Sequence, residues 1–217
     1  MQAKQEQTLF SCALDGDLER IQCLIEEKNV SINTDSVELD DILWETDEVG
    51  RNAVFVASML GRSSVVQELV TKKCAEVNAS TTRGYSLLHC SAMWGHLDTV
   101  KALIELGADL HAISFRGETA VDVARRYSQS ECVDHLAWAD AKQSLEASIA
   151  QIRDIMADPE KGQEKLNKED KNTCVKICSA KTTWIQKTKN PTTQEFIEQK
   201  KELEDVLAPI LAKLATV

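Results

Sequence analysis

The chain has 217 residues, of which 43% are apolar and only 5% aromatic, and its net charge is −10. This apolar content supports a folded core and excludes wholesale disorder. The charge is uneven, because residues 1–138 hold 22 acidic and 12 basic side chains whereas residues 139–217 hold 13 of each. An acidic first part repels phosphate, so we expect neither nucleic acid nor an anionic membrane surface as a partner.

Glycines recur along the first part with the period of a small helical repeat. Gly50, Gly84 and Gly117 lie 34 and 33 residues apart, and Gly61 and Gly95 follow the first two at an offset of 11. Such a period is typical of stacked helical units, none of which can bury its apolar face alone. The sequence therefore predicts an all-α solenoid of three to four repeats over residues 1–138.

The first repeat, residues 8–33, is followed by an acidic insertion near residues 34–48. Gly16 and Gly61 are 45 residues apart, which is 11 more than one period. The insertion holds seven acidic residues and no basic one, and it includes Trp44. It is either a solvated acidic loop on one face of the array or an acidic docking segment that Trp44 anchors.

The clearest repeat spans residues 82–112, and residues 50–79 and 116–138 follow its pattern more weakly. Gly95 separates its two helices, and Gly107 ends the second helix where a left-handed residue is needed. Its apolar residues recur at helical spacing in two stripes, Leu88, Ala92 and Leu97, then Val100, Leu103 and Ile104.

These residues resemble the ankyrin repeat, which carries a Leu-His pair, a Gly-His pair and a Gly-Ala-Asp end like Leu88-His89, Gly95-His96 and Gly107–Asp109. The resemblance covers about 130 residues. One departure is that the family's Thr-Pro step appears as Asn52-Ala53, Ser86-Leu87 and Thr119-Ala120. We expect these substitutions to remove rigidity and local hydrogen bonds where each first helix begins, and so to weaken the array.

The ankyrin resemblance implies that a protein partner binds to the hairpin tips and to outward positions of the first helices, on one concave wall. Arg, Met and aromatic residues recur at these positions, as they do in interaction hot spots. Alternatively, Trp94 or Met59 packs against the insertion or the C-terminal helices. The candidate positions are Arg51, Met59, Leu60, Arg83, Tyr85, Met93, Trp94, Phe115, Arg116, Arg126 and Tyr127.

Residues 139–165 read as a connecting helix and a linker. Leu145, Ile149, Ile152 and Met156 have helical spacing, and residues 158–164 carry a Pro and a Gly that indicate a break.

Two further helices are predicted in residues 166–217. The first begins near Asn167 and ends at Asn190-Pro191, and the second begins at Thr192, which stands in capping-box spacing with Glu195. Pro209 is expected to kink the second helix or to begin a new one. The residues expected to be buried are Ile177, Cys178, Trp184, Phe196, Leu203, Val206, Leu207, Ile210 and Leu214.

Residues 166–217 resemble the lid subdomain of seventy-kilodalton heat-shock chaperones, through Cys178, Trp184, Phe196, Lys201–Glu204 and Pro209-Ile210 at the family's spacing. The resemblance implies a small helical bundle that binds a heat-shock chaperone or self-associates. A chaperone cofactor is therefore the alternative function. Proteins that combine these two parts are associated with cilia, so the resemblance also implies a possible ciliary location.

Catalytic chemistry is not expected. His89 stands beside Cys90, but the ankyrin resemblance implies that this histidine bonds the backbone of a neighbouring hairpin. Cys174 and Cys178 share a helix face and lack two further zinc ligands nearby, so we expect them to be buried apolar residues. No phosphate-binding glycine loop or framed carboxylate pair is found, so no cofactor and no metal are expected.

The leading hypothesis is a non-enzymatic adaptor in the cytoplasm. The seven cysteines show no close-spaced disulfide framework, and the first residues show no signal peptide. No apolar run reaches the roughly 18 residues of a membrane helix, so membrane insertion is not expected.

Overall fold

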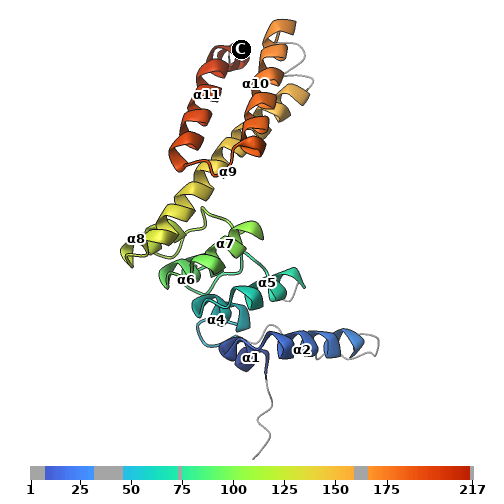
Figure 1. The fold of residues 1–217 in the computed structure, drawn as a ribbon, viewed down its shortest axis with the longest axis vertical. Coiled ribbons are helices and arrows are strands. Elements are labelled where there is room, and N and C mark those ends of the chain that lie inside the picture. Colours follow the sequence, from blue (N-terminus) through green and yellow to red (C-terminus); the bar gives the residue numbers. More distant parts are fainter. Residues whose placement is uncertain (1–7, 32–45, 73–74, 159–165, 216–217) are drawn as a thin grey trace, which may run out of the picture. The chain divides into compact units, whose positions relative to one another are not determined.

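The computed structural model describes residues 8–31, 46–72, 75–158 and 166–215 (Figure 1). Every regular element among these residues is a helix, apart from one isolated bridge between Ser80 and Ser86, so the predicted all-α class is confirmed. The chain divides into two compact units, Met1–Leu136 and Ala137–Val217.

The first unit is a stack of helix pairs. The first helices of the pairs, α1, α4, α6 and α8, pack against one another in chain order, and the second helices α2, α5 and α7 do the same (Figure 1). The bounds are α1 Leu9–Asp15, α2 Leu18–Ser31, α4 Ala53–Met59, α5 Ser63–Thr71, α6 Leu87–Met93, α7 Leu97–Glu105 and α8 Ala120–Arg126, and α9, Ser130–Ala157, follows α8.

A polar side chain starts each first helix. Thr8, Asn52, Ser86 and Thr119 each accept a hydrogen bond from the backbone N–H three residues later, at 3.2 to 3.4 Å. Such a cap contributes about 1 kcal/mol. The expected loss of local hydrogen bonds at these starts is therefore wrong, because Asn and Ser do the capping that Thr does in the family's pattern. What the helix starts lack is the proline.

Three polar side chains join successive repeats. Arg62, His96 and Gln129 donate from their side chains to the backbone oxygens of Leu14, Met59 and Met93, at 3.5, 2.8 and 3.4 Å. Each acceptor lies at the end of the preceding first helix, where carbonyl groups have no partner within the helix. These bonds therefore fix how each repeat sits on the one before it.

Glycine is required beneath these side chains. A Cβ added at Gly16, Gly61 or Gly95 would come within 2.9, 2.5 or 2.2 Å of Arg62, His96 or Gln129. These glycines also have φ between +70° and +76°, which favours glycine. In the fourth helix pair, formed by α8 and the start of α9, Ser128 stands at this position with φ of 60°.

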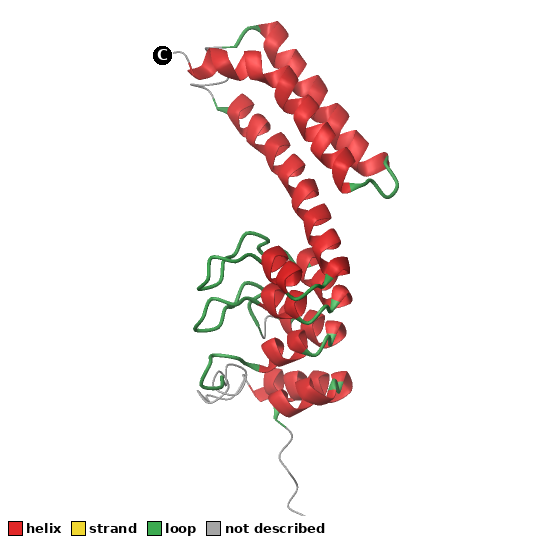
Figure 2. Cartoon of the chain, turned by 90° about the vertical axis from the view of Figure 1, so that its left-hand side faces the viewer, coloured by secondary structure: helices red, strands yellow, loops and turns green. Residues whose placement is uncertain are grey.

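The repeats are also joined at three hairpin tips, residues 47–51, 81–85 and 114–118. Within each tip the N–H of the first residue donates to the carbonyl of the fifth, at 2.9 Å. Between tips, Thr82 N–H donates to Val49 O at 3.3 Å and Phe115 N–H donates to Arg83 O at 3.0 Å. The connecting loops therefore project on the same side of the first unit, as Figure 2 shows.

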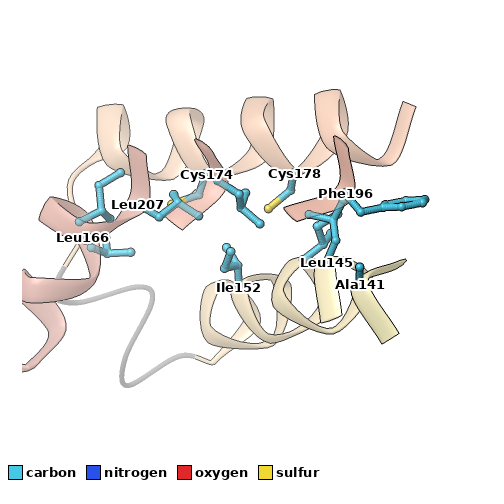
Figure 3. Packing of buried hydrophobic residues seen from close by; sticks show 11 residues of the cluster. Ala141, Leu145, Ile152, Leu166, Cys174, Cys178, Phe196 and Leu207 are labelled. Atoms are coloured by element: carbon cyan, nitrogen blue, oxygen red, sulfur yellow. The ribbon is translucent and has the colours of Figure 1, made fainter. Parts of the chain in front are cut away.

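The second unit packs the later part of α9 with α10, Lys168–Lys187, and α11, Thr193–Ala215. Two aromatic contacts stabilise its core, because the Phe196 ring meets the rings of Trp138 and Trp184 edge-on at 5.8 and 5.4 Å. The buried cluster, shown in Figure 3, consists of Ala141, Leu145, Ile149, Ile152, Leu166, Cys174, Cys178, Phe196, Leu203, Leu207 and Ile210.

The predicted helix starts of the second unit are confirmed. Asn167 accepts a hydrogen bond from Asp170 N–H at 2.7 Å. Thr192 and Glu195 form the reciprocal capping box, with Thr192 N–H donating to Glu195 Oε2 at 2.7 Å and Glu195 N–H donating to Thr192 Oγ1 at 3.2 Å.

Other predictions for this part were wrong in detail. The helix expected from residue 139 begins at Ser130. The alternative that Pro209 begins a new helix is wrong, because α11 continues through it to Ala215, whereas the expected kink stays a prediction. Val206 was expected in the core and is 43% exposed. The predicted linker residues 159–165, insertion residues 34–45 with Trp44, and the side chain of Leu214 lie outside the described residues.

We predict that Gly95→Ala destabilises the first unit by about 1–3 kcal/mol, because alanine is strained at positive φ and its Cβ displaces Gln129 from Met93 O. Ser128→Gly is the matched control. It should change the free energy of unfolding by less than about 1 kcal/mol, because relief of strain opposes the greater entropy of the unfolded chain. Urea denaturation measures both, and equal effects would contradict the proposed role of the glycine.

Candidate protein-binding face

The candidate face comprises the 11 positions named above, from Arg51 to Tyr127. A column of three large side chains runs along it. Leu60, Trp94 and Tyr127 follow the last residues of α4, α6 and α8, with φ of −99°, −93° and −94°. They are 45%, 56% and 48% exposed. Because the three helices pack in succession and end in the same backbone conformation, these side chains occupy equivalent places in the stack.

Met59 and Met93 precede this column by one residue. Both are half-buried, and their backbone oxygens accept the bonds from His96 and Gln129. Trp94 is exposed and does not pack as a core residue of the first unit. The methionine side chains thus lie next to the column, while their backbone oxygens hold successive repeats together.

Aromatic and arginine side chains gather at the last two tips and on α8. The Tyr85 ring meets the Phe115 ring edge-on at 5.9 Å. Arg116 lies 5.4 Å from the centre of the Phe115 ring, and Arg126 lies 5.0 Å from that of Tyr127. A hydrogen bond to the Tyr85 side chain is the main cause that raises the pKa of Arg126. We call Arg83, Tyr85, Phe115, Arg116, Arg126 and Tyr127 the arginine–aromatic cluster.

The arginines of the candidate face differ in how they are paired. Arg51 donates to Asp47 at 2.6 Å within its own tip, so its guanidinium serves mainly to hold that turn. Arg126 lies 3.2 Å from Glu118 Oε2. That pairing is one of charge, since this oxygen accepts no hydrogen bond from the described chain. Arg83 and Arg116 are exposed and form no ion pair with any described residue.

The acidic end of the insertion takes part in a tip. Asp47 accepts hydrogen bonds from the backbone N–H groups of Val49 and Arg51, each at 2.9 Å. The Arg51 backbone bond is the main cause that lowers the pKa of Asp47. This aspartate is therefore a structural part of the first tip.

His89 is a structural residue, as the ankyrin resemblance implied. It is fully buried, and its Nε2 donates to Glu118 O at 3.0 Å. Since a carbonyl can only accept, the proton is on Nε2, and Nδ1 accepts from Ser86 N–H at 3.2 Å. Both ring nitrogens are thus occupied, and His89 joins the third repeat to the fourth.

The neighbouring thiols are poor nucleophiles. Burial raises the pKa of Cys90 to about 12, with Arg51 opposing the shift, and both nitrogens of His89 are committed elsewhere. Burial also raises the pKa of Cys174 and of Cys178, which lie in the core of the second unit as expected for apolar cysteines. Within the described ranges, no three His, Cys, Asp or Glu side chains gather as metal ligands.

Two exposed apolar residues near the candidate face, both in the first unit, were missed by the sequence analysis. Ile113 is 63% exposed beside the third tip, and Leu14 is 44% exposed at the end of α1. The position of Ile113 immediately before Ser114 and Phe115 could have indicated a tip residue. Leu14 is one residue before the last position of α1, and the weak first repeat hid that register.

Comparison with known proteins gives one consistent family. A model of ankyrin repeats matches residues 9–114 and 55–147. The chain is 58% identical over 214 residues to ankyrin repeat domain-containing protein 45 of Danio rerio, covering 99% of this chain and 94% of that protein. It is 45% identical over 208 residues to the protein of that name in Homo sapiens, covering 96% and 77%. The Mus musculus protein is 46% identical over 211 residues, covering 97% and 84%.

We predict that acid weakens the first unit through His89. Burial lowers the pKa of His89 below 6.5, so between that folded pKa and 6.5 the unfolded chain binds a proton that the native chain does not. The contribution is therefore complete above about pH 6.5 and is lost as the pH falls toward the folded pKa, by at most about 1.4 kcal/mol per pH unit.

Urea denaturation between pH 7.5 and 5 checks this, with His89→Asn as the variant that cannot titrate. The variant should be less stable at neutral pH and should show a smaller loss on acidification. His135, whose pKa burial also lowers, is present in both proteins and does not affect the difference. Parallel curves for the two proteins would contradict the assignment.

Proposed function

Because this chain belongs to the ankyrin repeat family and is a homologue of ankyrin repeat domain-containing protein 45, we propose that it is a non-enzymatic adaptor that binds a protein partner through the candidate face. Ankyrin repeats generally mediate protein binding. The observation that carries the proposal is the column of Leu60, Trp94 and Tyr127, exposed at equivalent places of consecutive repeats.

The chemistry of the face supports protein binding. Trp, Tyr and Arg dominate the hot spots of protein interfaces, and the column together with the arginine–aromatic cluster presents all three. Ring contacts and guanidinium stacking hold several of these side chains in place, so less conformational entropy is lost on binding.

Two further observations bear on reaction chemistry and location. The one His-Cys neighbour pair of the repeats is committed to structure, which supports a non-enzymatic role. The described cysteines are all free thiols, which supports the proposed cytoplasmic location, and a place in the cilium rests on the family resemblance alone. No described helix is long and apolar enough to cross a bilayer.

The second candidate function is contact with a heat-shock chaperone, or self-association, through residues 166–217. The observation in its favour is a cavity of about 140 Å³ in the second unit, lined by Ile152, Met156, Cys174 and Cys178 and by Val175, which is 57% exposed. Arg153 and Ser179 complete its lining, and a largely apolar site of this kind can receive a side chain of a partner. The lid resemblance of this part remains a proposal.

We predict that Tyr85→Ala with Trp94→Ala weakens partner binding at least about 30-fold, because two hot-spot rings are truncated. Proximity labelling in cells identifies the partners, and their affinity for the purified variant is then measured. Lys101→Ala with Glu105→Ala on α7 is the control, since it truncates two exposed side chains of the outer helix. Equal affinities of a folded double variant and the wild type would show that partners do not bind through this face.

For the second unit we predict that Val175→Asp in the full chain reduces self-association or chaperone binding at least about tenfold, because a charge at an apolar contact is costly. Analytical ultracentrifugation and titration with a purified heat-shock chaperone measure the two. Lys176→Asp, at the next exposed position of α10, controls for charge. Wild-type protein that stays monomeric and binds no chaperone rules this candidate out.

A further inference from the structure

The arginines of the first unit are distributed unevenly. Residues 1–138 carry 12 basic side chains against 22 acidic ones. Five of the 12 lie at the tips or in the last turn of α8, namely Arg51, Arg83, Arg116, Arg125 and Arg126. Arginine is thus concentrated at the tips and at the end of α8, where the acidic residues Asp47, Glu48 and Glu118 also lie.

Three of these arginines are neutralised by neighbours. Arg51 is paired with Asp47, Arg125 lies 3.2 Å from Asp122, and Arg126 lies 3.2 Å from Glu118. Arg83 and Arg116 remain unpaired among the described residues. They stand on adjacent tips, which the bond from Phe115 N–H to Arg83 O joins.

The unpaired groups stand beside apolar surface. Arg116 stacks on the Phe115 ring, which contacts the Tyr85 ring. The Tyr85 side chain in turn bonds Arg126, which stacks on Tyr127. A guanidinium held against a ring keeps its donors free for a carboxylate, and such a pair can be bidentate. Trp94, exposed in the next position of the column, offers a ring to an apolar side chain.

From this arrangement we propose that the partner contributes an extended acidic segment with an aromatic or large aliphatic side chain. Its carboxylates bind Arg83 and Arg116, and its apolar side chain packs against Trp94 and Tyr127. This inference rests on the proposed function and adds the chemistry of the partner. Polyphosphate chains do not fit, because two guanidinium groups without an ion pair in the described ranges cannot offset the repulsion from the rest of the acidic unit.

A random library of 12-residue peptides displayed on phage, selected against the full chain, tests the proposal. The selected peptides should contain Asp and Glu at least about three times as often as the library, beside Trp, Phe or Leu. The best peptide should bind Arg83→Gln with Arg116→Gln at least about tenfold more weakly, because two charge-assisted pairs are lost. Its affinity should also fall between 0.1 and 0.5 M salt, because salt screens the attraction between the exposed guanidinium groups and the carboxylates of the peptide.

Lys101→Gln, which removes a positive charge from α7, is the matched control and should bind as the wild type does. Selection of neutral or basic peptides, or a binder unaffected by the arginine substitutions, overturns the proposal. Binding of the partners identified in cells to the two pairs of variants distinguishes a failure of this proposal from a failure of the proposed function. Partners that depend on Tyr85 and Trp94 but not on the two arginines leave the adaptor standing, whereas partners that depend on neither pair remove both.

Discussion

The first unit depends on a polar side chain that crosses from each repeat to the end of the preceding first helix. Arg62, His96 and Gln129 satisfy carbonyl groups that the helices leave open, and they do so over a glycine that has no Cβ to obstruct them. Arg62 and His96 stand directly before α5 and α7, so the same contact also places the start of each second helix. The alignment of the tips and of the exposed column follows from it, because each is fixed relative to the helix ends.

The exception in the fourth pair supports this reading. Ser128 has the same left-handed backbone as the glycines, with φ of 60°, but it carries a side chain. Backbone geometry alone therefore does not require glycine at this position. Close approach of the following repeat's polar side chain does, and among the described glycines it occurs at Gly16, Gly61 and Gly95.

The sequence predicted the repeat and its all-α class, because a period of glycines and helical spacing are properties of the chain itself, and the ankyrin resemblance implied the structural role of His89. It did not predict the contacts between repeats, because three different residue types, Arg62, His96 and Gln129, make the same bond and show no common pattern. Capping was misjudged for a related reason, since Asn52 and Ser86 do by geometry what the family's pattern assigns to threonine. Val206 was misplaced because its helix spacing suits two faces, and only the packing of α11 decides between them.

For the candidate face, the sequence could indicate which positions belong to it but not whether their charged side chains are paired. Arg51 and Arg116 are equivalent as residue types at a tip, yet Asp47 neutralises one and no described residue pairs with the other. That difference arises from which neighbours the fold brings near. On the proposal above, it also gives the acidic unit a means of selection, because long-range repulsion disfavours strongly charged polyanions while the two arginines that lack an ion pair among the described residues act at contact distance. A partner with a few carboxylates beside an apolar side chain would satisfy both conditions, so the proposed chemistry of the partner follows from the balance of charges on this unit.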